Sequence, residues 1–184
     1  MTPELQHIVK GCKQYQPREQ EALYRLCYEP MMAVCLRYTP FREQAADLYN
    51  QAMLKVFRSI DQFENKGVFL GWVRRIVVNT CIDHCRREVK YSIRPLDDEE
   101  EVSVQVPPET ENRIAAEDII NWIRELPRST GLVFNLFAIE GYRHDEIATH
   151  LGISTGTSKW HVNEARRQLQ LKLKQAHEIK NHVI

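Results

Sequence analysis

The sequence of 184 residues lacks any apolar run of membrane-spanning length, and its N-terminus lacks the apolar core of a signal peptide. It has no apolar–polar alternation long enough to predict a strand, and no internal repeat. It also lacks a phosphate-binding loop, a nucleophile paired with a base, and paired carboxylates on predicted helices. These absences predict an all-α cytoplasmic protein that inserts into no membrane, is not an enzyme and uses no cofactor.

Cysteine is present, but not in a pattern that predicts a disulfide or a zinc site. The five cysteines are odd in number and form no CxxC pair, which is typical of reduced thiols in a cytosolic protein. Cys81, His84 and Cys85 could share a helix face and hold a metal ion, but the sequence offers no fourth ligand nearby. Packing of the thiols between helices is therefore the favoured interpretation, and no metal is expected.

The sequence also has no net charge, because 25 basic residues balance 25 acidic ones. A protein that binds DNA by itself is usually basic. The balance conceals a local asymmetry. Residues 70–94 hold six basic and two acidic residues, residues 95–118 hold one basic and nine acidic, and residues 153–184 hold six basic and two acidic. Two basic segments therefore flank an acidic one.

Residues 140–171 predict a helix-turn-helix. A short helix over residues 145–151 places Ile147 and Leu151 on one small apolar face. Gly152 follows at once, where the chain needs a left-handed residue to leave the helix. Ser154 or Thr155 can cap the next helix, because a hydroxyl accepts a hydrogen bond from the orphan amides at a helix start.

The second helix of this pair is longer and has an apolar stripe at spacings of three and four, formed by Val162, Ala165 and Leu169. The residues left over offer positive charge, hydrogen bonding and an aromatic surface, a combination suited to the major groove of DNA. They are Lys159, Trp160, His161, Asn163, Arg166 and Arg167. A plain helical hairpin with a solvated charged face is the alternative. The polar tail after Leu173 is expected to fray.

Apolar positions at helical spacing predict further helices over residues 42–60, 69–90, 112–125 and 129–139. The helix over 69–90 has a wide apolar band and a polar side rich in arginine. Asn79 lies in the middle of this helix, where asparagine is poorly favoured. It is either a tolerated surface residue or an amide that reads a base.

Residues 91–111 contain three prolines, the acidic run DDEEE and no helical period, which together predict an extended linker. The acidic residues either keep the linker solvated or mimic a nucleic-acid backbone. The composition favours the first of these alternatives. The predicted organisation is all-α, with two small helical modules over residues 1–90 and 112–184 joined by this acidic linker.

Taken in order, these segments resemble a bacterial sigma factor of the sigma-70 family, of the extracytoplasmic-function (group four) type. The stretches REQAADLYNQAMLKVF and FLGWVRRIVVNTCIDHCRR resemble the two functional helices of sigma region 2, which forms a helical bundle. The stretch from LPRSTGLVF to NEARRQL resembles region 4, a four-helix module with a helix-turn-helix, and TSKWH is similar to the version in Bacteroidetes-type members.

The resemblance implies roles for residues of the first module. Polymerase-docking positions fall on Asp47, Leu48, Gln51 and Phe57, although Tyr49, Asn50 and Ala52 depart from the family's usual DLVQETF segment. Asn79 falls on the family asparagine that holds a base turned out of the minus-ten element. The residues implied to contact minus-ten DNA are Trp72, Arg75, Asn79, Arg86 and Arg87.

In the second module the resemblance implies that the minus-thirty-five element is contacted by Thr157, Lys159, Trp160, His161, Asn163, Arg166 and Arg167. Compared with the common family string GTVKSRLxRAR, Ser158, Trp160, His161 and Glu164 are departures. Glu164 could accept a hydrogen bond from cytosine or repel phosphate, so the promoter sequence cannot be carried over.

The family further implies a set of partners: core RNA polymerase, through its beta-prime clamp and beta flap, promoter DNA both double-stranded and melted, and an anti-sigma factor. The predicted function is to direct core polymerase to specific promoters and to help melt the minus-ten element. A stand-alone helix-turn-helix transcriptional regulator is the alternative, and it predicts tight, specific DNA binding without polymerase. An enzyme is disfavoured, because no catalytic constellation is found.

Overall fold

A computed structural model describes residues 1–64, 68–89 and 116–181. The chain divides into two compact units, Met1–Cys85 and Arg86–Ile184. The described residues contain helices and no strand, which confirms the all-α prediction. None of these helices combines the length and the hydrophobicity needed to cross a membrane. The predicted linker at residues 91–111 lies outside the described residues.

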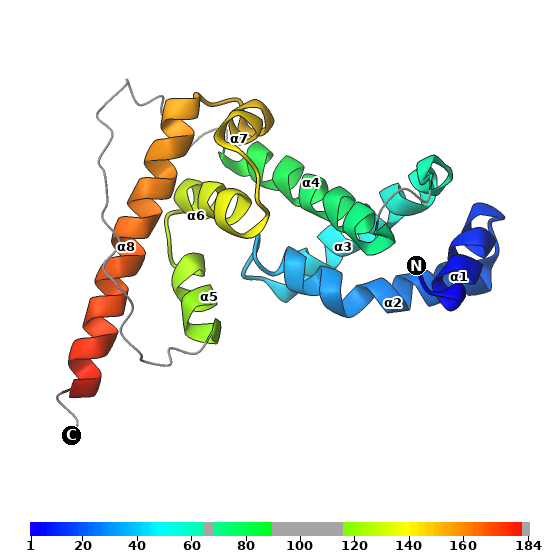
Figure 1. Cartoon of the computed structure of the whole chain (residues 1–184), viewed down its shortest axis with the longest axis horizontal. Coiled ribbons are helices and arrows are strands. Elements are labelled where there is room, and N and C mark those ends of the chain that lie inside the picture. Colours follow the sequence, from blue (N-terminus) through cyan, green and yellow to red (C-terminus); the bar gives the residue numbers. More distant parts are fainter. Residues whose placement is uncertain (65–67, 90–115, 182–184) are drawn as a thin grey trace. The chain divides into compact units, whose positions relative to one another are not determined.

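The N-terminal helices are α1 (Pro3–Lys13), α2 (Pro17–Cys35), α3 (Arg42–Ser59), the short 3-10 turn η1 (Ile60–Gln62) and α4 (Phe69–Val89) (Figure 1). The first of them begins as its sequence dictates, because the Thr2 hydroxyl accepts a hydrogen bond from the Leu5 amide at 3.3 Å. α1 packs against α2, and α2 packs against α3. Their apolar stripes, together with one side of α4, form the core of this module.

All five cysteines are buried thiols within this core. The Cys35 and Cys81 side chains are hydrogen-bonded to each other, and the Cys85 thiol contacts the Tyr38 carbonyl at 3.8 Å. Among the described residues, no group of three or more His, Cys, Asp and Glu side chains is placed to hold a metal ion. The cysteines therefore act as packing residues between helices.

A cluster of three tyrosines joins α2 to α3. Tyr49 is completely buried, and its hydroxyl donates to the Tyr24 carbonyl. The Tyr49 ring contacts Tyr24 and Tyr28 edge-on, at centroid distances of 4.9 and 5.4 Å. Burial raises the pKa of the Tyr49 phenol, which stays neutral. The departure of Tyr49 from the usual family segment is therefore a core feature rather than a surface one.

The C-terminal helices are α5 (Ala116–Arg124), α6 (Arg128–Phe134), the π-helical turn η2 (Asn135–Ile139), α7 (His144–Leu151) and α8 (Thr155–Asn181). In Figure 1, α5 and α6 lie beside the long helix α8, and α7 lies near its N-terminal end. α8 continues as far as Asn181, into the polar tail that was expected to fray. Residues 174–181 of the tail include two Lys, one Gln, one Ala and one Glu, which are all good helix formers, so intrinsic propensity favours the helix there.

Candidate nucleic-acid interface

The turn between α7 and α8 has the geometry that the sequence predicts. Gly152 ends α7 in the left-handed conformation, with φ of 69°, and its amide donates to the Ala148 carbonyl at 2.8 Å. Ser154 caps α8, because its hydroxyl accepts from the Thr157 amide at 2.9 Å. These two caps fix the angle at which α8 leaves α7.

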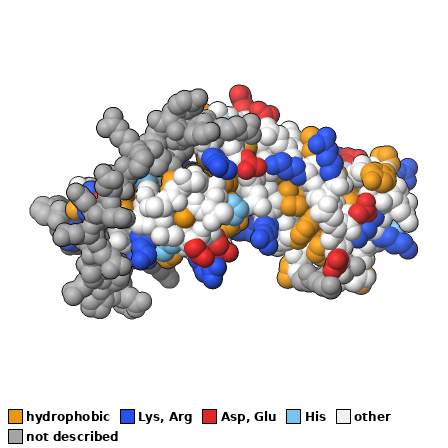
Figure 2. All heavy atoms as spheres, turned by 90° about the horizontal axis from the view of Figure 1, so that it is seen from above, with side chains coloured by type: hydrophobic (Ala, Val, Ile, Leu, Met, Phe, Trp, Pro, Cys, Tyr) orange, Lys and Arg blue, Asp and Glu red, His pale blue; other side chains and the backbone are white. Residues whose placement is uncertain are grey.

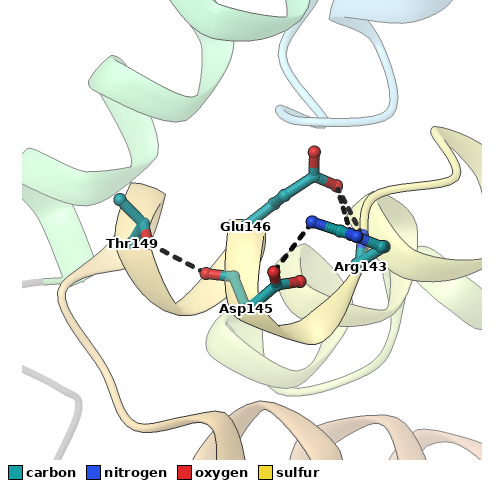
Figure 3. Close-up of polar contacts among 4 residues, drawn as sticks. All are labelled: Arg143, Asp145, Glu146 and Thr149. Atoms are coloured by element: carbon teal, nitrogen blue, oxygen red, sulfur yellow. Dashed lines mark hydrogen bonds and ion pairs between the residues drawn. The ribbon is translucent and has the colours of Figure 1, made fainter.

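Polar contacts hold the start of α7 (Figure 3). The Glu146 carboxylate accepts from the Arg143 amide at 2.8 Å, and Asp145 pairs with the Arg143 guanidinium at 2.9 Å. Two acidic side chains thus lie at the positive end of the helix dipole. The Thr149 hydroxyl donates to the Asp145 carbonyl one turn later, at 2.9 Å. α7 is therefore a defined support for α8 although it is only 8 residues long.

Along α8, a polar surface runs at positions i, i+1, i+4, i+7 and i+8, which share one side of a helix. We call it the α8 stripe, and it consists of Lys159, Trp160, Asn163, Arg166 and Arg167. All of these side chains are exposed except that of Asn163, which is half-buried, and Trp160 is 40% exposed. Behind the stripe, Val162 and Ala165 are buried against the rest of the module.

Two residues predicted for this exposed surface lie inside the module instead. His161 is only 6% exposed, and its Nδ1 shares a hydrogen bond of 3.0 Å with the Thr130 hydroxyl of α6. Thr157 is also buried, and its hydroxyl bonds to that of Ser154 at 2.9 Å. Both are therefore buried rather than exposed: His161 has a partner on α6 that periodicity does not reveal, and Thr157 bonds to the cap residue three positions before it.

A chain of contacts connects α7 to the α8 stripe. The His144 Nδ1 shares a hydrogen bond of 3.0 Å with the hydroxyl of Ser158, which is fully buried. The His144 ring stacks on Phe137 at a centroid distance of 4.5 Å, and the Arg166 guanidinium lies 5.8 Å from the centroid of the same phenyl ring. The Arg166 guanidinium therefore lies over an aromatic ring while the residue stays exposed.

We expect the C-terminal module to lose stability as the pH falls below about 6.5, the ordinary pKa of histidine. Burial lowers the pKa of His161, and burial together with Lys159 and Arg166 lowers that of His144. The neutral imidazoles therefore contribute fully above the ordinary pKa, and their contribution declines as the pH falls toward the lowered values. Amide hydrogen exchange in α8, corrected for intrinsic rates and compared at about pH 7.5 and 5.5, measures the effect. Equal protection of α8 at both pH values would contradict this expectation. The control is the His7→Gln variant, which changes a histidine of the other module and should leave the pH dependence of α8 unchanged.

The second candidate surface lies on α4. Trp72, Arg75, Asn79 and Arg86 follow one another at spacings of three, four and seven, so they share one side of this helix. Trp72 and Asn79 are half-buried, and the two arginines are exposed. Trp72 packs against Phe63 and Phe69 at centroid distances of 5.5 and 5.7 Å. The side chain of Arg87, the remaining residue predicted here, lies outside the described side chains.

Lys13 of α1 also supports this aromatic group. Its Nζ donates to the Phe63 carbonyl at 2.9 Å, and Phe63 in turn contacts Phe69 at 5.0 Å. Residues 65–67, in the loop before α4, lie outside the described residues. Figure 2 shows Lys and Arg side chains interspersed with hydrophobic ones on the visible face of this module.

The third candidate surface is the exposed side of α3, and it corrects one prediction. Asp47 and Gln51 are exposed as expected and Phe57 is half-buried, but Leu48 is only 1% exposed and belongs to the core. Leu54, which the sequence reasoning missed, is 55% exposed and lies two turns after Asp47 on the same side of the helix. Its spacing of seven from Asp47 and three from Gln51 was the signal that could have identified it.

Comparison with known proteins follows this division of the chain. Residues 23–91 match the family model for Sigma-70 region 2, and residues 116–169 match the model for Sigma-70, region 4. The ECF RNA polymerase sigma factor SigE of Mycolicibacterium smegmatis is 30% identical over 155 residues, which are 82% of this chain and 56% of the relative. SigM of Mycobacterium tuberculosis is 30% identical over 127 residues, 69% of this chain and 63% of the relative.

The chain thus spans between half and two thirds of the length of these relatives. Its fold is similar to that of the sigma factor RpoE from Bartonella quintana, solved in complex with the anti-sigma factor NepR. The TM-score is 0.50 and the identity 24%, over 84% of this chain and 96% of that one. The two family regions together cover more than half of the sequence, in the order region 2 then region 4. The chain therefore belongs to the sigma-70 family, of the extracytoplasmic-function type.

Proposed function

We propose that this chain directs core RNA polymerase to specific promoters and helps to melt the minus-ten element. The observation that carries the proposal is the presence of both sigma regions in one chain, each with an exposed polar surface on the helix that the family uses for DNA. A sigma factor need not bind DNA tightly alone, because polymerase contacts and two promoter contacts add through linkage. This agrees with its zero net charge.

In this proposal the α8 stripe contacts the minus-thirty-five element. Lys159 and Arg166 supply cations for phosphates, and Asn163 and Trp160 offer an amide and an aromatic surface to base edges. His161 and Thr157 then serve beneath the interface, where their hydrogen bonds fix the rotation of α8. The side of α4 with Trp72, Arg75, Asn79 and Arg86 contacts the minus-ten element.

The proposed protein partners are the beta-prime clamp for the exposed side of α3 and the beta flap for the C-terminal module. An anti-sigma factor is a further proposed partner, since the structurally similar RpoE was solved in complex with one. Action together with polymerase implies a cytoplasmic location.

Run-off transcription from a promoter library tests the function. Core polymerase from a related bacterium is assayed with and without the protein, and start sites that require the protein are expected. Absence of initiation, combined with tight and sequence-specific DNA binding by the protein alone, would favour the stand-alone regulator instead.

We expect Leu54→Asp to weaken binding to core polymerase by about tenfold or more, because docking through this side of α3 would bury the new carboxylate without a partner. Leu54 is 55% exposed, so the substitution spares the core. Affinity is measured by fluorescence anisotropy of the labelled full-length chain. Leu26→Asp, at an exposed leucine of α2, is the matched control. Similar losses in both variants would exclude a specific docking role for Leu54.

A further inference from the structure

The carboxylate of Glu164 is held by two neighbours on α8. Its Oε2 accepts from the Arg167 Nε at 2.8 Å, and its Oε1 accepts from the Arg167 Nη2 at 2.7 Å. The same Oε1 also accepts from the Gln168 Nε2 at 2.6 Å. Parallel N–H···O bonds from one guanidinium to one carboxylate form the bidentate pair that arginine also makes with phosphate.

The two members of this pair differ in exposure. The Glu164 side chain is only 19% exposed, whereas that of Arg167 is 58% exposed. The Arg167 hydrogen bonds lower the pKa of Glu164 to about 2, so the carboxylate is charged throughout the physiological range. Glu164 is thus a fixed and permanently charged acceptor, while Arg167, which it holds, belongs to the α8 stripe.

We infer that Glu164 competes with promoter phosphates for Arg167 and thereby keeps the intrinsic DNA affinity of the C-terminal module low. To contact a phosphate, Arg167 must exchange the Glu164 carboxylate for it, and the two acceptors use the same donor fork. The arginine then contributes little net affinity. Arg166 lies over the Phe137 ring and has no such carboxylate among its described contacts.

This inference rests on the proposed function for its biological meaning, since a weakly binding module makes promoter recognition depend on polymerase. Its physical content is independent of that function. It concerns the affinity of the full chain for any duplex DNA, which is measured without polymerase. A failure of sigma activity in transcription would therefore leave the result interpretable.

Glu164→Gln is expected to raise the affinity of the full chain for non-specific duplex DNA by roughly three- to tenfold at low salt. One additional phosphate contact steepens the dependence of log K on log salt by about 0.9. Fluorescence anisotropy with a labelled duplex across a salt series measures both quantities, and retention on immobilised heparin gives a second reading. Helicity by circular dichroism verifies that α8 is intact.

A double-mutant cycle separates competition from simple repulsion of DNA by the acid. Arg167→Ala alone should change the affinity less than about twofold, because the arginine is already occupied. In the Arg167→Ala background, Glu164→Gln should give no further gain. An equal gain in both backgrounds would show that Glu164 repels DNA directly and would overturn the inference.

Two more outcomes would also overturn it. A loss of affinity confined to duplexes with a particular cytosine would mean that Glu164 reads a base. An equal gain in DNA affinity from Glu125→Gln would show that the effect comes only from the change in overall charge. Glu125, the residue that follows α5, is the matched control, because it pairs with Lys172 of α8 outside the α8 stripe.

Discussion

Asn79→Ala is expected to reduce initiation from minus-ten-dependent promoters by roughly ten- to a hundredfold, because a bidentate amide contact to a base contributes about 1–3 kcal/mol. Asn79 lies at the middle of α4, half-buried, between Arg75 one turn before it and Arg86 two turns after it. Turning a base out of the duplex costs a few kcal/mol, and a contact made only in the turned-out state offsets that cost.

Run-off transcription with reconstituted holoenzyme measures this effect. On a template whose minus-ten region is already melted, the defect should become smaller, because the cost of opening the duplex has been removed. Alanine has the higher helix propensity, so loss of the helix is not the expected cause of a defect. Asn121→Ala on α5 makes the same chemical change in the other module and should leave initiation unchanged. Full activity of Asn79→Ala would remove this residue from the proposed mechanism.

Tyr49→Ala is expected to lower the free energy of unfolding of the N-terminal module by about 3–5 kcal/mol, the typical cost of removing a large buried aromatic side chain. Since small domains have only about 5–15 kcal/mol in total, this loss removes a large share of the module's stability. The loss combines a cavity between α2 and α3 with the contacts to Tyr24 and Tyr28. Polymerase binding should fall with it, because α3 carries the proposed docking surface.

Urea denaturation of the full chain, followed by hydrogen exchange in α3, measures the change. Tyr49→Phe keeps the ring and removes only the hydroxyl bond to the Tyr24 carbonyl, so its expected cost is about 1 kcal/mol. Tyr15→Ala removes the same atoms from an exposed site and should be nearly neutral. If Tyr49→Ala were as well tolerated as Tyr15→Ala, the tyrosine cluster could not be the main link between α2 and α3.

Helical periodicity was enough to predict α3 and α4, and local capping residues were enough to predict the turn between α7 and α8. The caps at Gly152 and Ser154 are local, because they depend on backbone conformation and on hydrogen bonds within three or four residues. The same locality explains why α3 and α4 begin and end within one or two residues of the predicted ranges. The order of two recognisable motifs also led directly from the sequence to the sigma family.

Which polar side chains face outward was decided only by the tertiary structure. His161 and Trp160 are adjacent and both plausible for a DNA surface, yet α6 supplies Thr130 as a partner for the histidine, which turns it inward. Leu48 and Leu54 are likewise one residue type on one helix, and the structure places the first in the core and the second on the surface. Helical spacing gives the angle between residues, but burial depends on partners that are distant in sequence.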